Sequence, residues 1–188
     1  KEDSVGSQGL SEGPRLKKLR DKGRAGLKLA DFANLPGARQ AGLTQAEVAC
    51  VRLYTSFERV SWLLNQALRS WSKDQIQPWA TTICILISAI IKLSQLSSPD
   101  TVVYSGMPPC TFKALESFSG NSGKETYVQY GFLPSTRDPK QNASYVGGKF
   151  TETVVWVIES TFSSRPADVS IISMYPEEEE MLFLSQSV

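Results

Sequence analysis

Four consecutive glutamates, Glu177 to Glu180, lie near the C-terminal end of the sequence, directly before the apolar residues MLF. Like charges in a row repel one another, so the run costs stability unless solvent or a function accounts for it. If the run is extended, its side chains alternate between two faces, which places Glu178 and Glu180 on the same side. Two carboxylates in one groove separate their pKa values, so one can act as a base while the other hydrogen-bonds a ligand hydroxyl. The competing interpretation is an exposed acidic turn without a ligand.

The composition limits which chemistry these carboxylates can join. The chain has 188 residues, a net charge of +1 and no histidine. Without histidine, Ser-His-Asp and Cys-His nucleophilic catalysis and the usual zinc and non-haem iron ligand sets are excluded. The three cysteines, Cys50, Cys84 and Cys110, are far apart and show no metal-ligand spacing. We therefore expect no metal, and the small net charge indicates no nucleic-acid partner.

The charge distribution divides the chain into two parts. Residues 1–40 carry nine Lys and Arg against five Asp and Glu, whereas residues 41–188 carry eleven against fourteen. We predict a flexible basic segment over 1–40 and one domain over 41–188. The apolar run from Trp79 to Ile91 has only thirteen residues. A membrane-spanning helix needs about 20 residues, so this run predicts a buried helix and no membrane span.

Helices are predicted in the first half of the chain. Order is expected to begin near Leu43, because Thr44 followed three residues later by Glu47 forms a capping box before an apolar-periodic run. Further helical patterns cover residues 59–71 and 75–96.

Strands are predicted in the second half, where the period changes. They are expected over residues 101–107, 127–133, 151–160, 169–175 and 181–185, with a helix at 109–118 and a turn with a short helix at 138–150 between them. Helices first and strands second indicate an α+β domain.

This order of elements, from Leu43 to Val188, resembles the R-S-E class of mono-ADP-ribosyltransferases, the arginine-specific type with a Glu-x-Glu signature. The resemblance rests on the segments LTQAEVACVRLYTSF, LLNQALRS, VVYSGM, GFLPSTRD, GGKF and ISMYPEEEEMLF. The last segment is the most specific, because in this family the Glu-x-Glu pair directly precedes an apolar strand. By position, Glu180 is the second, catalytic glutamate and Glu178 is the first.

The resemblance implies N-terminal helices followed by two small, mainly antiparallel sheets that form a cleft for NAD, which is a substrate and needs no metal. The catalytic glutamate stabilises an oxocarbenium-like state, and the first glutamate positions or deprotonates the acceptor side chain. Pro134 replaces the first serine of the Ser-Thr-Ser triplet, and Ser135 is expected to hydrogen-bond Glu180 in its place if the strand end shifts by one residue.

The remaining candidate NAD-binding residues are also implied by the resemblance. Ser105 lies where the family has an arginine that clamps the NAD phosphates, Gly106 follows it, and Thr136 is the last residue of the altered triplet. Arg137 is the nearest replacement for the missing arginine, and Phe150 corresponds to an aromatic residue near the nicotinamide.

Three functions follow as hypotheses. The first is an NAD-dependent mono-ADP-ribosyltransferase that modifies an arginine or a hydroxyl residue of a protein. By family analogy it would be a monomeric toxin or virulence effector, secreted into the host cytosol or otherwise cytoplasmic, with actin, a small GTPase or ubiquitin as possible targets. The second, motivated by Ser105 and Pro134, is a catalytically inactive relative that serves as a binding module. The third is a non-enzymatic α+β domain whose glutamate run is a solvated turn.

Overall fold

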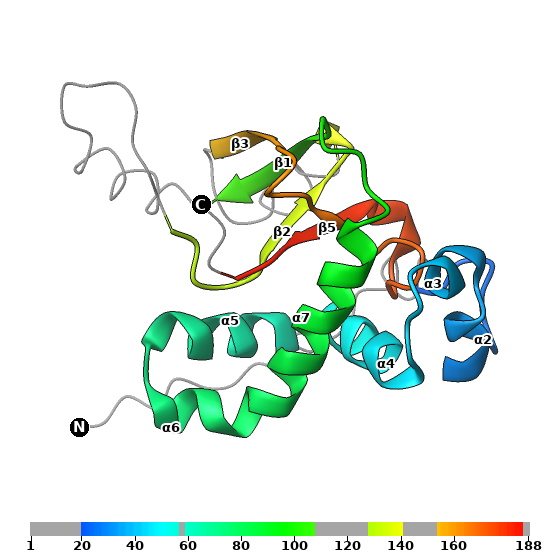
Figure 1. Ribbon diagram of the computed structural model, residues 1–188, viewed down its shortest axis with the longest axis horizontal. Helices are drawn as coiled ribbons and strands as arrows, with labels where there is room; N and C mark the ends of the chain where they lie inside the picture. Colours follow the sequence, from blue (N-terminus) through cyan, green and yellow to red (C-terminus); the bar gives the residue numbers. More distant parts are fainter. Residues whose placement is uncertain (1–19, 57–58, 108–127, 141–153, 186–188) are drawn as a thin grey trace, which may run out of the picture.

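The computed structural model describes residues 20–56, 59–107, 128–140 and 154–185. The helical half contains α2 (Leu29–Ala33), α3 (Pro36–Gln40), α4 (Gln45–Tyr54), α5 (Val60–Ser70), α6 (Lys73–Ile76), η1 (Gln77–Trp79) and α7 (Ala80–Ser94). The second half contains β1 (Val102–Met107), β2 (Leu133–Thr136), β3 (Val154–Glu159), β4 (Ala167–Asp168), η2 (Pro176–Glu178) and β5 (Glu180–Phe183). The helices pack on the sheet from one side, as Figure 1 shows. The predicted α+β class is confirmed.

The strands that the structure describes form one five-stranded sheet in the order β3-β1-β2-β5-β4, and all four pairings are antiparallel. We predicted two small sheets. In the described ranges the two groups of strands are joined, because β2 pairs with β1 on one side and with β5 on the other. The β2–β5 register places Thr136 opposite Glu180 and Ser135 opposite Met181. Glu180 therefore lies at the start of a strand that is paired on both sides.

Two predicted strands are wrong. The second strand is Leu133–Thr136, not residues 127–133, because the main chain at Phe132 is bound by a helix instead of a strand. The Asn65 side chain accepts from the N–H of Phe132 at 2.8 Å and donates to its carbonyl at 3.2 Å. Residues 169–175 form turns, because their carbonyls bind arginine side chains. The predicted strands at 101–107, 151–160 and 181–185 are confirmed as β1, β3 and β5, with small differences at their ends, whereas the predicted helix at 109–118 lies outside the described residues.

The helices begin earlier than predicted. Order does not start at Leu43, since α2 and α3 precede it and bury Phe32 and Ala38 in the main core. Both residues lie within residues 1–40, which we predicted to be flexible, so that prediction is wrong for this part of the segment. The sequence signal was missed because α2 and α3 have only five residues each, too few for a helical period to emerge. In Figure 1 they lie beside the connection that leads into β5.

The apolar helix α7 is continuous with α6 and η1. Together they cover Lys73–Ser94, a run of 22 residues that is long and apolar enough to cross a membrane by length and composition alone. One face of α7 belongs to the core, through Ile83, Leu86, Ala89, Ile90 and Leu93. Cys84 and Ile91 on the same helix are exposed. The absence of a membrane span thus stays a prediction.

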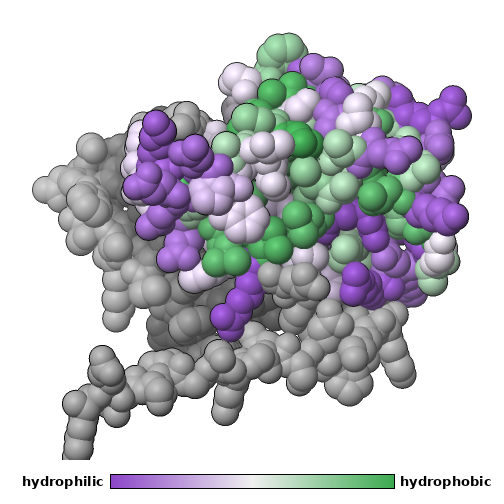
Figure 2. All heavy atoms as spheres, turned by 90° about the horizontal axis from the view of Figure 1, so that it is seen from below, coloured by the Kyte–Doolittle hydropathy of each residue, from purple (hydrophilic) through white to green (hydrophobic). Residues whose placement is uncertain are grey.

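Two hydrophobic clusters hold the sheet from its two faces. The larger cluster lies between the helices and the sheet and includes Phe132, Ile172 and Leu182. The smaller one contains Val103, Met181 and Phe183 on the opposite face. Successive residues of β5 therefore alternate between two buried faces, which fixes the register of the strand that begins with Glu180. On the side seen in Figure 2, hydrophobic residues gather at the centre between hydrophilic flanks.

The predicted capping box at the start of α4 is present and is part of a buried charge network. The Glu47 carboxylate accepts from the N–H of Thr44 at 2.7 Å, from the hydroxyl of Ser88 at 2.6 Å and from the ammonium group of Lys92 at 2.8 Å. Burial alone would raise the pKa of Glu47, but these hydrogen bonds, that of Lys92 foremost, lower it to about 2. The ionised carboxylate thus joins α4 to α7.

We expect Glu47→Gln to lower the free energy of unfolding at pH 7 by about 2–3 kcal/mol, because Lys92 and Ser88 lose their charged partner. The contribution of this charge is present above the ordinary carboxyl pKa of 4.5 and is lost as the pH falls through about 2. Urea denaturation of both proteins at pH 7 and pH 3 measures the difference. Asp31→Asn, which changes the exposed capping residue of α2, is the matched control. Equal effects of the two substitutions at pH 7 would contradict the buried network.

Candidate active site

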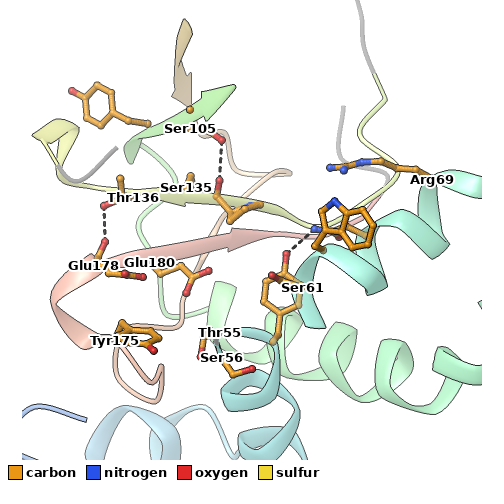
Figure 3. A pocket seen from close by; sticks show the side chains of 16 residues that line it. Thr55, Ser56, Ser61, Arg69, Ser105, Ser135, Thr136, Tyr175, Glu178 and Glu180 are labelled. Atoms are coloured by element: carbon orange, nitrogen blue, oxygen red, sulfur yellow. Dashed lines mark hydrogen bonds between the residues drawn. The ribbon is translucent and has the colours of Figure 1, made fainter. Parts of the chain in front are cut away.

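A cavity of about 420 Å³ lies between the helices and the sheet, and both Glu178 and Glu180 line it. Residues of α4 and α5 and of the segments around them form one wall, and β1, β2 and the start of β5 form the other. Figure 3 shows Glu178 and Glu180 side by side at one end of this pocket and Arg69 at the other. The described lining is completed by Tyr54, Thr55, Ser56, Ser61, Trp62, Asn65, Tyr104, Ser105, Gly106, Pro134, Ser135, Thr136 and Tyr175.

The glutamates reach the pocket by a different backbone path from the one predicted. Glu178 ends the short 3-10 turn η2, Glu179 follows in the left-handed region with φ 46°, and Glu180 begins β5. The run is therefore not extended, and strand alternation is not what brings the pair together. Instead, Glu179 reverses the chain between them, and the hydroxyl of Thr136 donates to the carbonyl of Glu178 at 2.7 Å. The prediction that both carboxylates face one groove is confirmed, for another physical reason.

The electrostatics of the pocket separate the two carboxyl groups. Removal from water, and next the negative charge of Glu178, raise the pKa of Glu180 to about 8. Burial, and next the negative charge of Glu180, also raise the pKa of Tyr54. The Tyr54 hydroxyl accepts a hydrogen bond from the Asn65 side chain at 3.0 Å. Glu180 is thus a carboxyl group poised to change its charge near neutral pH.

Three candidate hydroxyl residues hold the main chain of the sheet around the glutamates. Ser105 donates to the carbonyl of Pro134 at 2.9 Å, which ties β1 to β2. Ser135 donates to the carbonyl of Met181 at 3.1 Å, rather than to the Glu180 carboxylate. Since Thr136 also binds a carbonyl, all three side chains fix the position of the strands that carry the pocket.

The other candidate residues fall in different places. Gly106 lines the pocket as predicted. Arg137 does not, because its guanidinium pairs with the Asp168 carboxylate at 3.1 Å on a partly exposed part of the sheet edge. Its role as the replacement for the missing arginine therefore stays a prediction, which this position does not favour. Phe150 lies outside the described residues.

Sequence reasoning missed the helical wall of the pocket. Among the described lining residues, Arg69 is the only one with a basic side chain, and Trp62 on the same helix is 57% exposed. Both belong to α5, and Asn65 between them binds Tyr54 and the main chain of Phe132. The available signal was the segment LLNQALRS, whose Asn65 and Arg69 lie four residues apart and therefore on one face of a helix.

The described residues show no group of three His, Cys, Asp or Glu side chains that could hold a metal ion. The expectation that no metal is needed stays a prediction.

Comparison with known proteins points to one family. The family model described as NAD:arginine ADP-ribosyltransferase matches residues 17–187. None of the curated proteins matches significantly. Solved structures with the same fold include the ADP-ribosyltransferase HopU1 of Pseudomonas syringae pv. tomato, which is 20% identical with a TM-score of 0.61 and covers 90% of this chain and 76% of that one.

Two exoenzymes are also similar. The Clostridium limosum C3 exoenzyme is 12% identical with a TM-score of 0.59, covering 85% of this chain and 83% of that one. Exoenzyme S from Pseudomonas aeruginosa is 23% identical with a TM-score of 0.52, covering 84% and 76%; its structure contains human 14-3-3 protein beta and carba-NAD.

Proposed function

Since this chain belongs to the NAD:arginine ADP-ribosyltransferase family, we propose that it transfers ADP-ribose from NAD to an arginine side chain of a protein. The observation that carries the proposal is the presence of Glu178 and Glu180 in one pocket, with the pKa of Glu180 raised. The pocket volume of about 420 Å³ suits part of a dinucleotide.

Glu180 is proposed to act on the nicotinamide ribose. When the bond between C1′ and the nicotinamide nitrogen breaks, the electron pair leaves with nicotinamide and the ribose develops positive charge. An ionised Glu180 accepts a hydrogen bond from a ribose hydroxyl and stabilises that charge electrostatically. Because the group that leaves is neutral nicotinamide, it needs no general acid.

Glu178 is proposed to act on the acceptor. A guanidinium group is a poor nucleophile until it loses a proton, and a neighbouring carboxylate both attracts it and can accept that proton. The nitrogen of the acceptor then forms its bond to C1′ as the proton passes to Glu178. This assignment favours arginine over a hydroxyl acceptor, because a second carboxylate complements a positive side chain.

Arg69 is proposed to take the role left open by Ser105. The NAD pyrophosphate is negatively charged, and Ser105 offers no charge and already binds the Pro134 carbonyl. Arg69 extends from α5 at the far end of the pocket from Glu178, as Figure 3 shows. A guanidinium there can bind phosphate oxygens with two parallel hydrogen bonds.

The remaining partners are proposals by analogy. The similar exoenzymes favour a secreted effector that modifies a host protein. Actin, a small GTPase and ubiquitin stay the suggested targets, and the monomeric state stays a prediction. The alternative function, an inactive binding module, is favoured by Ser105 and Pro134.

The first test is incubation with a labelled NAD analogue and a cell lysate, followed by mass spectrometry of labelled proteins. Label transfer by the natural sequence that is absent with Glu180→Ala would support the transferase and identify the target. An enzyme that neither transfers label nor hydrolyses NAD, although it binds NAD, would favour the binding module instead.

We expect the activity to depend on the ionisation of Glu180. Since its pKa in the free protein is about 8, kcat/KM for NAD hydrolysis should rise about tenfold per pH unit below pH 8 and level off above it. Glu178→Gln removes the neighbouring charge, so the midpoint of its profile should lie at lower pH. Initial rates of nicotinamide release from pH 5.5 to 9 measure both profiles. A midpoint near the ordinary carboxyl value of 4.5, or identical midpoints for the two proteins, would contradict this electrostatic account.

The same pKa shift affects stability with a defined sign. Between pH 4.5 and about 8 the folded state holds a proton on Glu180 that the unfolded state has lost. Unfolding therefore becomes easier as the pH rises through this window.

A further inference from the structure

The connection between β4 and β5, residues 169–179, delivers Tyr175 and Glu178 to the pocket. Strand pairing holds Glu180, which lies opposite Thr136 in the sheet. Glu178 precedes the strand, so its position depends on the Thr136 hydroxyl that binds its carbonyl and on how the rest of the connection is held.

Four consecutive carbonyl groups of this connection, those of residues 171–174, are bound by residues from distant parts of the chain. Arg24 donates to the first and the third at 2.7 and 2.5 Å. Arg52 of α4 donates to the second at 3.1 Å, and the main-chain N–H of Asp21 donates to the fourth at 2.8 Å. One short N-terminal segment and one helix therefore bind every carbonyl over this stretch.

The two guanidinium groups are themselves held in place. Asp21 binds Arg52 through both carboxylate oxygens, at 3.0 and 2.8 Å. The Phe32 ring lies against both cations, with its centroid 3.7 Å from the Arg52 guanidinium carbon and 5.3 Å from that of Arg24. A third link is the ion pair between Lys22 and Glu177, one residue before Glu178. Charge pairing and cation–π contacts thus preorganise the donors.

We propose that Arg24 is a positioning residue: by fixing the carbonyls of Ile171 and Ser173 it holds the β4–β5 connection so that Glu178 faces the acceptor. Arg24 is not among the described residues that line the pocket, so its effect passes through the main chain. The inference rests on the proposed function. It gives a segment that precedes all the described helices a role in positioning the acceptor site.

The positioning role of Arg24 should affect ADP-ribose transfer and NAD hydrolysis differently. Hydrolysis of NAD needs Glu180, which the sheet holds, whereas transfer to a guanidine also needs Glu178. Arg24→Gln should therefore lower kcat for transfer to agmatine about 10- to 100-fold, the cost of misplacing a reacting group by about 1 Å. NAD hydrolysis and KM for NAD should change less than about threefold. Arg24→Lys keeps the charge without the fork and should give an intermediate loss.

A control and a second measurement keep loss of fold apart from loss of position. Glu47→Gln is destabilised but touches neither the connection nor the pocket, so its ratio of transfer to hydrolysis should equal that of the natural sequence. Hydrogen exchange at the amides of residues 172–175 and 177–179 should be faster in Arg24→Gln, and unchanged in Glu47→Gln under conditions where it is fully folded.

The outcomes are distinct. A normal ratio of transfer to hydrolysis in Arg24→Gln overturns the inference, even if exchange is faster. If the natural sequence does not turn over NAD, the proposed function fails, and unchanged exchange in Arg24→Gln then overturns the clamping of the connection as well.

Discussion

The Glu180→Gln variant is expected to lose both NAD hydrolysis and ADP-ribose transfer, each by a factor of about 100 to 1000. Glutamine keeps the size of the side chain and one carbonyl oxygen, but it has no negative charge to oppose the charge that develops on the ribose. The pKa of Glu180 is raised by burial and by Glu178, so its negative charge destabilises the folded state. Replacing the carboxyl group by an amide removes that electrostatic cost. The variant should accordingly unfold no more readily than the natural sequence at pH 8.

Glu178→Gln provides the matched comparison. It should lose transfer to agmatine by a similar factor and keep NAD hydrolysis within about tenfold, because water needs less activation than a guanidinium once the ribose cation has formed. Nicotinamide release and agmatine modification, measured with the same enzyme batch, separate the two reactions. Full NAD hydrolysis by Glu180→Gln would remove Glu180 from the catalytic role.

Replacing Arg69 by glutamine is expected to raise KM for NAD about 10- to 150-fold and to change kcat little. A charge-assisted hydrogen bond contributes about 1.5–3 kcal/mol, and losing this free energy weakens binding about 10- to 150-fold. Phosphate binding occurs in both the ground state and the transition state, which is why the effect should appear in KM. Arg69→Lys should recover part of the loss, since it restores the charge but not the planar fork.

Substitutions of two other arginines test whether the rise in KM for NAD is specific to Arg69. Arg39→Gln changes an exposed residue of α3 and should leave KM unchanged. Arg137→Gln tests the replacement that the sequence suggested, and the structure predicts no change, because Arg137 pairs with Asp168 away from the pocket. A larger rise in KM for Arg137→Gln than for Arg69→Gln would reverse the assignment.

The features that the sequence predicted well are local or concern residue type. The capping box needs only Thr44 and Glu47 at a spacing of three, and hydrogen bonding within one turn does the rest. The glutamate pair was found because like charges before a buried strand are unusual, although the backbone that brings the pair together is not a strand. The class of fold followed from the change of period near residue 100.

The features that it missed depend on contacts between distant segments. Residues 127–133 carry a strand-like pattern, but Asn65, 67 positions away from Phe132, takes the hydrogen bonds that a strand would need. Arg69 becomes a pocket residue only when α5 packs opposite the sheet. The ordering of residues 20–40 rests on Arg24 and Arg52 binding carbonyls about 120 to 150 positions later, which no local pattern contains.

The four glutamates are identical letters, yet the fold gives them four different surroundings. Glu177 pairs with Lys22, Glu178 and Glu180 line the pocket, and Glu179 is exposed with a positive φ. Pro176 starts η2 at one end, and the two buried faces of β5 fix Met181 at the other. The run therefore acts as a spacer of fixed length. Deleting any one of the four glutamates gives the same shortened sequence, and the turn at Glu179 then has one residue too few. Its length is constrained more tightly than its composition, since only two of its four carboxylates face the pocket.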